Sequence, residues 1–199
     1  MDEDEKIDEE KQRAQVDYVI VGGVTGILAF GFNGEFYMLE EDEMEHGLRI
    51  IVDRTAGRVP VYFGIGAINA KKYCRLAKTA VSNGTAAVSV LQPMFLKPTH
   101  DELFLHFKTI AGSIPDTPVL LYNNPGQVVY TLTTPLMNEL AHQMPNIVGM
   151  KDTSGDITLT EEFIRRTRDV GVPYRASLPT PAGAARDGFV RTMTAAGLL

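Results

Sequence analysis

The stretch IVGMKDTSGD, residues 147–156, is one of the two most informative in the chain, because a short apolar run leads through a lysine and a polar turn into a charged segment. A second stretch, VLLYNNPG at residues 119–126, repeats this form with a tyrosine at the end of the apolar run. Such runs predict buried strands. In α/β folds the active-site residues lie at the carboxyl ends of the strands, and this pattern places Lys151 and Tyr122 there.

Working outward, apolar runs alternate with charged amphipathic stretches from Ile7 to about Gly171, a pattern that predicts βα units and a parallel sheet. We expect strands at 26–30, 59–63, 86–91, 119–122 and 147–150. We expect helices at 8–21, 40–55, 69–82, 99–113, 133–143 and 156–169. The strands are rich in Val, Leu and Ile without strict alternation, which is typical of a sheet covered on both faces. A barrel and an open doubly wound sheet both satisfy this pattern.

Three helix starts carry local signals. Thr99 with Glu102 three residues later fits a capping box, Pro135 falls in a first helical turn, and Asp156 fits an N-cap. Residues 172–199 break the rhythm, since they are rich in Ala, Gly, Pro and Arg and contain no clear strand. We therefore expect one domain over residues 1–171 and an atypical, poorly ordered tail over residues 172–199.

Composition excludes several classes of function. The net charge of −6, with only 19 Lys and Arg among 199 residues, argues against nucleic acid as a partner. A single cysteine, Cys74, rules out an internal disulfide framework and points to a reducing compartment. The four histidines form no metal-binding motif, and we expect each on a helix surface: His46, His100, His106 and His142.

Nothing in the sequence predicts a membrane protein or a targeting signal. No run of about 18 apolar residues occurs. The first residues, MDEDE, are acidic where a secretory or transit peptide would be basic. These observations together favour a cytoplasmic protein.

Two residues could carry chemistry. A buried lysine at a strand end loses its proton more readily and becomes an amine nucleophile toward a carbonyl group, although a lysine there more often reaches out to solvent. A tyrosine hydroxyl beside it could transfer protons, although such a tyrosine is more often a packed core residue. Lys151 and Tyr122 occur at equivalent places in neighbouring units, which favours the chemical interpretation.

A glycine-containing turn, GFNGE at residues 31–35, follows the first predicted strand. Gly31 and Gly34 would let backbone N–H groups approach a carboxylate, although two glycines alone are weak evidence. The turn is no phosphate-binding loop, because no Gly-Lys-Ser/Thr follows it. A hydrolase or dehydrogenase is disfavoured, because neither G-x-S-x-G nor G-x-G-x-x-G supports it.

Together GFNGE, YNNPG and GMKDTSGD resemble, in order and spacing, the motifs of the class I Schiff-base lyases. That family contains dihydrodipicolinate synthase, N-acetylneuraminate lyase, and the 2-oxo-3-deoxy sugar acid and 4-hydroxy-2-oxoglutarate aldolases. The resemblance implies a (β/α)8 barrel, a homo-oligomer (dimer or tetramer) and no metal or organic cofactor. It also implies that Lys151 forms an imine with pyruvate or another 2-oxo acid, that Tyr122 relays protons, and that the turn with Asn33 holds the substrate carboxylate.

Three positions depart from the family pattern. Phe32 stands where the family usually has a hydroxyl residue, and Phe95 stands where many members have a tyrosine that reaches across a dimer. Both substitutions remove hydroxyls from the usual proton relay. Gln127 stands where dihydrodipicolinate synthases carry an arginine for the aldehyde's carboxylate. This position favours a neutral, polyhydroxylated or small aldehyde instead.

The resemblance covers about residues 2–171 and corresponds to the middle of a family chain, so we expect an incomplete barrel of about five strands. The leading hypothesis is an aldolase-type lyase acting on a 2-oxo acid, such as a 2-oxo-3-deoxy sugar acid or 4-hydroxy-2-oxoglutarate aldolase. One alternative is a non-catalytic fragment or pseudoenzyme that associates with intact relatives. Another is dihydrodipicolinate synthase itself.

Overall fold

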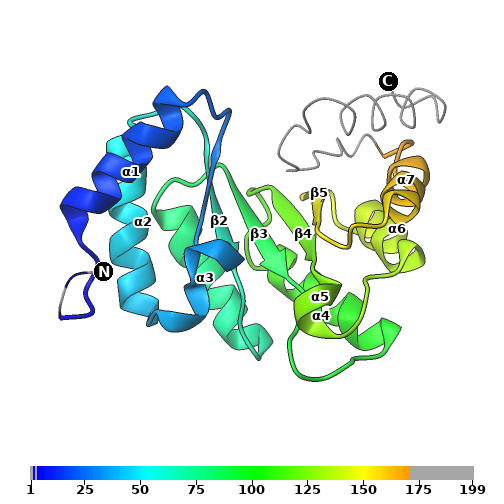
Figure 1. The fold of residues 1–199 in the computed structure, drawn as a ribbon. Coiled ribbons are helices and arrows are strands. Elements are labelled where there is room, and N and C mark those ends of the chain that lie inside the picture. The colour runs from blue at the N-terminus through cyan, green and yellow to red at the C-terminus, as the bar shows by residue number, and fades with distance from the viewer. Residues whose placement is uncertain (1, 3, 171–199) are drawn as a thin grey trace.

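A computed structural model describes residues 2 and 4–170 of the chain, and it contains one parallel sheet (Figure 1). The strand order is β1-β2-β3-β4-β5, so each strand pairs with the next one in the sequence. The strands are β1 (Ile27–Ala29), β2 (Val61–Ile65), β3 (Ala87–Leu91), β4 (Val119–Asn123) and β5 (Ile147–Asp152). This sequential parallel order with helical crossovers is that of a (β/α) barrel rather than of a doubly wound sheet, whose strand order reverses.

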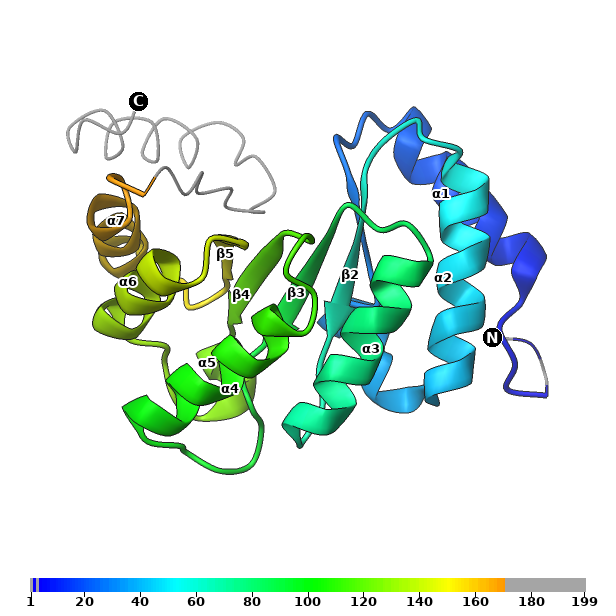
Figure 2. The same cartoon turned by 180° about the vertical axis from the view of Figure 1, so that it is seen from behind.

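Helices connect the strands and cover the sheet. They are α1 (Glu9–Val21), α2 (Glu41–Thr55), α3 (Ala70–Ser82), α4 (His100–Gly112), α5 (Pro125–Val128), α6 (Thr134–Gln143) and α7 (Ile157–Arg166). Figure 2 shows α2, α3 and α4 lying along the same face of the sheet. The largest fully buried side chains include Phe63 from β2, Tyr73 from α3 and Phe107 from α4. Burying each such side chain contributes about 1.5–3 kcal/mol to folding, so this core holds the layers together.

The predicted helix starts are confirmed by their capping geometry. Thr99 Oγ1 accepts a hydrogen bond from the backbone N–H of Glu102 at 3.3 Å, and the Glu102 carboxylate accepts one from the N–H of Thr99 at 2.8 Å. Asp156 accepts from two backbone N–H groups at the start of α7. Pro135 lies in the first turn of α6. Local signals fixed these boundaries because the side chains of Thr99 and Asp156 satisfy N–H groups that the helix leaves unpaired, whereas Pro135 needs no partner for an N–H and has a φ that suits the first turn.

Several expectations need correction. All five predicted strands and six predicted helices are present, but β5 continues two residues beyond the predicted end at Met150 and includes Lys151. The turn expected after Tyr122 contains a short helix, α5. The segment after β1 forms two 3₁₀ turns, Phe32–Gly34 and Phe36–Met38. The expected tail at residues 172–199 lies outside the described residues.

His106 is not the surface residue that the sequence pattern predicted. Its ring packs edge-on against Tyr73, with ring centroids 4.8 Å apart, and against Phe107 at 5.3 Å. Burial lowers the pKa of His106 from 6.5 to about 4. The other three histidines are exposed, as expected. Within residues 2 and 4–170, no helix combines the length and hydrophobicity needed to span a membrane.

Candidate active site

Strand register brings Lys151 and Tyr122 together. Tyr122 pairs with Lys151 across β4 and β5, and with Leu91 on its other side in β3. Residues paired across neighbouring strands point to the same face of the sheet. The lysine and the tyrosine therefore share one face of the sheet, and they lie near the carboxyl ends of their strands, where the sequence pattern placed them.

An irregularity in β5 makes this pairing possible. Val119 pairs with Ile147, but the next residue, Leu120, pairs with Gly149, so β5 carries one extra residue at Val148. Without the extra residue, Tyr122 would pair with the residue before Lys151. Because successive side chains alternate between faces, Lys151 would then point to the opposite face. The bulge thus sets the side chain of Lys151 on the face that carries Tyr122.

The environment of Lys151 favours the neutral amine. Its Nζ lies 3.9 Å from the centroid of the Tyr122 ring, and within the described part of the chain it forms no salt bridge. Burial lowers the pKa of Lys151 below its usual value of 10.5. The ring face acts in the opposite direction, because a cation over an aromatic ring is stabilised by the ring's electrons. A neutral amine next to a tyrosine is a competent nucleophile toward a carbonyl group.

Tyr122 is buried, with 6% of its surface exposed. Burial raises the pKa of its hydroxyl, and hydrogen bonds from Thr153 and Asn124 act in the opposite direction. Asn124 Nδ2 donates to Tyr122 Oη at 3.0 Å. The hydroxyl is therefore held in a defined position and stays protonated at neutral pH, as a proton donor must.

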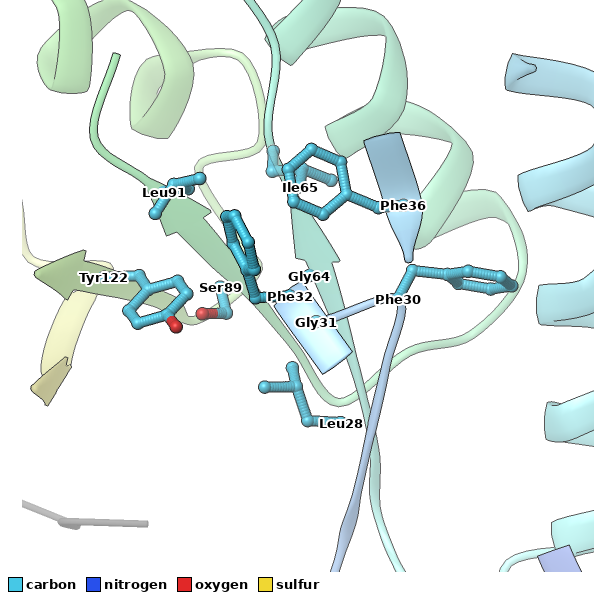
Figure 3. Close-up of a pocket in the computed structure, with 10 residues that line it drawn as sticks. All are labelled: Leu28, Phe30, Gly31, Phe32, Phe36, Gly64, Ile65, Ser89, Leu91 and Tyr122. Atoms are coloured by element: carbon cyan, nitrogen blue, oxygen red, sulfur yellow. The ribbon is translucent and has the colours of Figure 1, made fainter. Parts of the chain in front are cut away.

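The GFNGE turn reaches the site through its first two residues. A methyl group added at Gly31 would lie 3.9 Å from Lys151 Nζ, so the backbone there adjoins the amine. Gly31 and Phe32 line a small cavity with Tyr122 (Figure 3). Asn33 and Gly34 are exposed and do not line this cavity. The structure thus brings Gly31 to the lysine and tyrosine, but it leaves Asn33 and Gly34 outside.

The cavity is mostly apolar, with one notable polar group. It is lined by Leu28, Phe30, Gly31, Phe32, Phe36, Gly64, Ile65, Ser89, Leu91 and Tyr122. Ser89 is 1% exposed, and its Oγ has no hydrogen-bond partner among the described residues. Figure 3 shows this hydroxyl directed toward the side of the cavity that Tyr122 forms. Sequence reasoning missed Ser89, because one serine in an apolar strand gives no sign of its orientation.

Two buried polar side chains brace the carboxyl ends of the strands, and sequence reasoning assigned neither. The Asp152 carboxylate accepts hydrogen bonds from Asn123 Nδ2 at 2.8 Å, Thr160 Oγ1 at 2.8 Å, and Ser154 Oγ and N at 2.9 and 3.0 Å. Gln92, with no exposed surface, bridges β3 to the segment after β4. In the sequence, the one sign of a role for Asp152 was that a charged residue directly follows Lys151 at the end of an apolar run.

The remaining positions of interest lie at the periphery. Gln127 is exposed on α5 and does not line the cavity. Phe95 is 76% exposed and has a positive φ of 72°, an unusual conformation for a residue other than glycine. Within residues 2 and 4–170, no group of three or more His, Cys, Asp or Glu side chains is arranged to hold a metal ion.

Comparison with known proteins identifies the family. The model of the dihydrodipicolinate synthetase family matches residues 1–174. The 4-hydroxy-tetrahydrodipicolinate synthase of Sorangium cellulosum is 34% identical over 165 residues, which cover 83% of this chain and 54% of that protein. The enzyme of the same name from Methanoculleus marisnigri is 36% identical over 163 residues, covering 82% and 55%. The chain spans about half the length of these relatives.

Solved structures agree with this assignment. A prophage protein of the dihydrodipicolinic acid synthase family from E. coli K12, in complex with pyruvate, has a TM-score of 0.84 and 29% identity, covering 88% of this chain and 59% of its own. Dihydrodipicolinate synthase DapA-2 from Bacillus anthracis has a TM-score of 0.86 and 31% identity, covering 99% and 64%. The chain therefore belongs to the dihydrodipicolinate synthetase family, and its five parallel strands form part of that family's barrel fold.

Proposed function

We propose that this chain forms an imine between Lys151 and pyruvate or a similar 2-oxo acid, and acts as an aldolase-type lyase. The observation that carries the proposal is a partly buried lysine, without a salt bridge among the described residues, paired across the sheet with a buried tyrosine. Family membership supports it, as do the solved relatives in complex with pyruvate from E. coli K12 and Acinetobacter baumannii.

The chemistry follows from the two side chains. The neutral amine of Lys151 attacks the C2 carbonyl of the 2-oxo acid, and loss of water leaves a protonated imine. The imine withdraws electrons, so a proton leaves C3 and an enamine forms, which adds to an aldehyde carbonyl to make a carbon–carbon bond. Hydrolysis returns the amine, and the reverse sequence cleaves the bond. Tyr122, held beside Nζ, donates and accepts the protons in these steps.

The aldehyde partner is the least constrained element. Gln127 cannot form an ion pair with an aldehyde's carboxylate, which favours a neutral, polyhydroxylated or small aldehyde. The named relatives are 4-hydroxy-tetrahydrodipicolinate synthases, so the synthase reaction is the second candidate. A non-catalytic role in association with intact relatives is the third, and Phe32 in the cavity favours it because this side chain carries no hydroxyl. A homo-oligomer and a cytoplasmic location stay predictions.

The proposed function is tested by hydrogen exchange, which requires no knowledge of the aldehyde. Pyruvate is incubated with the protein in heavy water, and proton NMR follows loss of the methyl signal as enamine formation exchanges the C3 protons. Lys151→Arg should abolish the exchange, because arginine cannot form the imine. Lys78→Arg, on the exposed face of α3, is the matched control and should exchange like the wild type. Wild-type protein without exchange above the buffer rate would overturn the proposal.

A second assay separates the two aldehyde classes. With pyruvate present, consumption of a neutral hydroxyaldehyde is compared with consumption of an aldehyde that carries a carboxylate. Because Gln127 cannot form an ion pair with a carboxylate, the wild type should prefer the neutral aldehyde, and Gln127→Arg should shift the preference toward the aldehyde that carries a carboxylate. Preference for the charged aldehyde in the wild type would favour the synthase reaction.

A further inference from the structure

We propose that Asn124 is a positioning residue for Tyr122, which fixes the phenol by donating a hydrogen bond to its oxygen. This inference rests on the proposed function of Tyr122 as the proton-transfer group and adds a residue that controls it. The side chain of Asn124 is buried, with 8% of its surface exposed, and its Nδ2 lies 3.0 Å from Tyr122 Oη.

Asn124 stands at the start of a helix but does not cap it. It is the N-cap residue of α5, a position where asparagine usually accepts a hydrogen bond from the backbone N–H two or three residues later. Here the side chain makes no capping hydrogen bond. It donates to Tyr122 instead, so the contact replaces the usual local role of the residue.

Gln92 holds Asn124 in the orientation that the contact requires. Gln92 Oε1 accepts from the backbone N–H of Asn124 at 3.1 Å, and Gln92 Nε2 donates to the carbonyl oxygen of Tyr130 at 2.5 Å. The backbone N–H of Gln92 also donates to the carbonyl oxygen of Tyr122 at 3.2 Å. A fully buried amide therefore ties together both ends of the segment that carries Asn124.

The chemical consequence is directional. An amide N–H donates only, so it occupies a lone pair of Tyr122 Oη and cannot take up the phenolic proton, and a second described side chain, that of Thr153, also hydrogen-bonds this hydroxyl. When the phenol gives that proton away, the same N–H stabilises the phenolate that forms, and a hydrogen bond to a charged group is the stronger kind. Phe32, which lines the same cavity, cannot make such a bond. Asn124 thus supplies to Tyr122 a hydrogen-bond donor that Phe32 cannot supply.

The test measures the ionisation of Tyr122 directly and needs no substrate. The chain has seven tyrosines, so the absorbance of phenolate is titrated in each protein and in the same protein carrying Tyr122→Phe, and the difference isolates Tyr122. Fluorotyrosine incorporated throughout brings the titration into a pH range where the fold survives. Asn124→Leu, which keeps the size and removes the donor, should lower the ionisation constant about tenfold. Asn124→Asp, which replaces the donor by a negative acceptor, should lower it further.

The control is Asn83→Leu, which removes a partly buried amide hydrogen bond to the carbonyl oxygen of Thr79 at the end of α3. It should leave the ionisation of Tyr122 unchanged. An unchanged constant in both Asn124 variants would overturn the proposal, and so would an equal shift in Asn83→Leu. Pyruvate exchange measured on the same proteins reports the proposed function separately. A shifted titration of Tyr122 without pyruvate exchange would support the role of Asn124 and refute only the proposed lyase function.

Discussion

Gly64 gives the sharpest test of how closely β1 and β2 pack at the site. It lies in β2, paired with Ser89, and a Cβ atom there would meet the carbonyl oxygen of Phe30 at 2.7 Å and the backbone nitrogen of Gly31 at 3.1 Å. Both contacts are to backbone atoms, which cannot rotate away as a flexible side chain would. The substitution Gly64→Ala must therefore displace the turn that carries Gly31.

The cost follows from these contacts. Overpacking of this kind destabilises by about 1–3 kcal/mol, and the lower backbone entropy of unfolded alanine offsets about 0.5–1 kcal/mol of it. The net destabilisation is therefore up to about 2.5 kcal/mol, and at about 1–3 kcal/mol per molar of urea the denaturation midpoint should fall by up to about 2.5 M. Pyruvate exchange should fall as well, because Gly31 adjoins Lys151 Nζ.

A matched substitution makes this prediction specific. Gly112, at the end of α4, has no atom within 4 Å of the position that a Cβ would occupy. Gly112→Ala should leave the stability unchanged or raise it by up to about 1 kcal/mol. Circular dichroism in urea measures both variants. If Gly64→Ala denatures at the wild-type midpoint or above it, the close approach of the two backbones is refuted.

Three further outcomes follow from the structure. Asp152→Asn should destabilise the fold by about 2–4 kcal/mol, because an amide cannot accept all four hydrogen bonds of the carboxylate. The control Asp116→Asn, at an exposed position, should change the free energy of unfolding little, and urea titration measures both variants. The pKa of His106 falls from 6.5 to about 4 on folding, so the unfolded chain binds more protons than the folded chain between these pH values. The contribution of His106 to stability is therefore present above pH 6.5 and is lost as the pH falls toward 4. Thermal melts of His106→Leu at a series of pH values should lack this part of the pH dependence. Val129 is 80% exposed and has a φ of 59°, so a β-branched residue is held in the left-handed region. Val129→Gly should relieve about 1–3 kcal/mol of strain, against about 0.5–1 kcal/mol for the larger backbone entropy of unfolded glycine, and should raise the thermal midpoint. A lower midpoint would show that the backbone at Val129 is not strained.

The sequence predicted the elements well because its signals were local. The apolar runs that became β4 and β5 have no competing interpretation as long helices, and Thr99 and Asp156 mark their helices by hydrogen bonds within a few residues. The places of Lys151 and Tyr122 at the carboxyl ends of strands were predicted from the apolar runs before them, but their pairing across β4 and β5 was not. Its physical cause, the extra residue in β5, was not predictable because register depends on contacts between strands.

The parts that were missed depend on orientation and tertiary contact. Nothing in the sequence distinguishes His106, packed between two aromatic rings, from its exposed counterparts. Asn33 was expected at the carboxylate-binding turn, yet its side chain is exposed while Phe32 lines the cavity. Asn124 and Gln92 act through side-chain hydrogen bonds between segments far apart in the chain, which no pattern of residue types reveals.

The central claim is that Lys151 is the amine that bonds to the substrate, and its most direct test is covalent trapping. The protein is incubated with pyruvate and reduced with borohydride, and peptide mass spectrometry locates the reduced adduct. We expect an adduct on the peptide that contains Lys151 and none in Lys151→Arg. No adduct, or an adduct spread over exposed lysines such as Lys78, would contradict it.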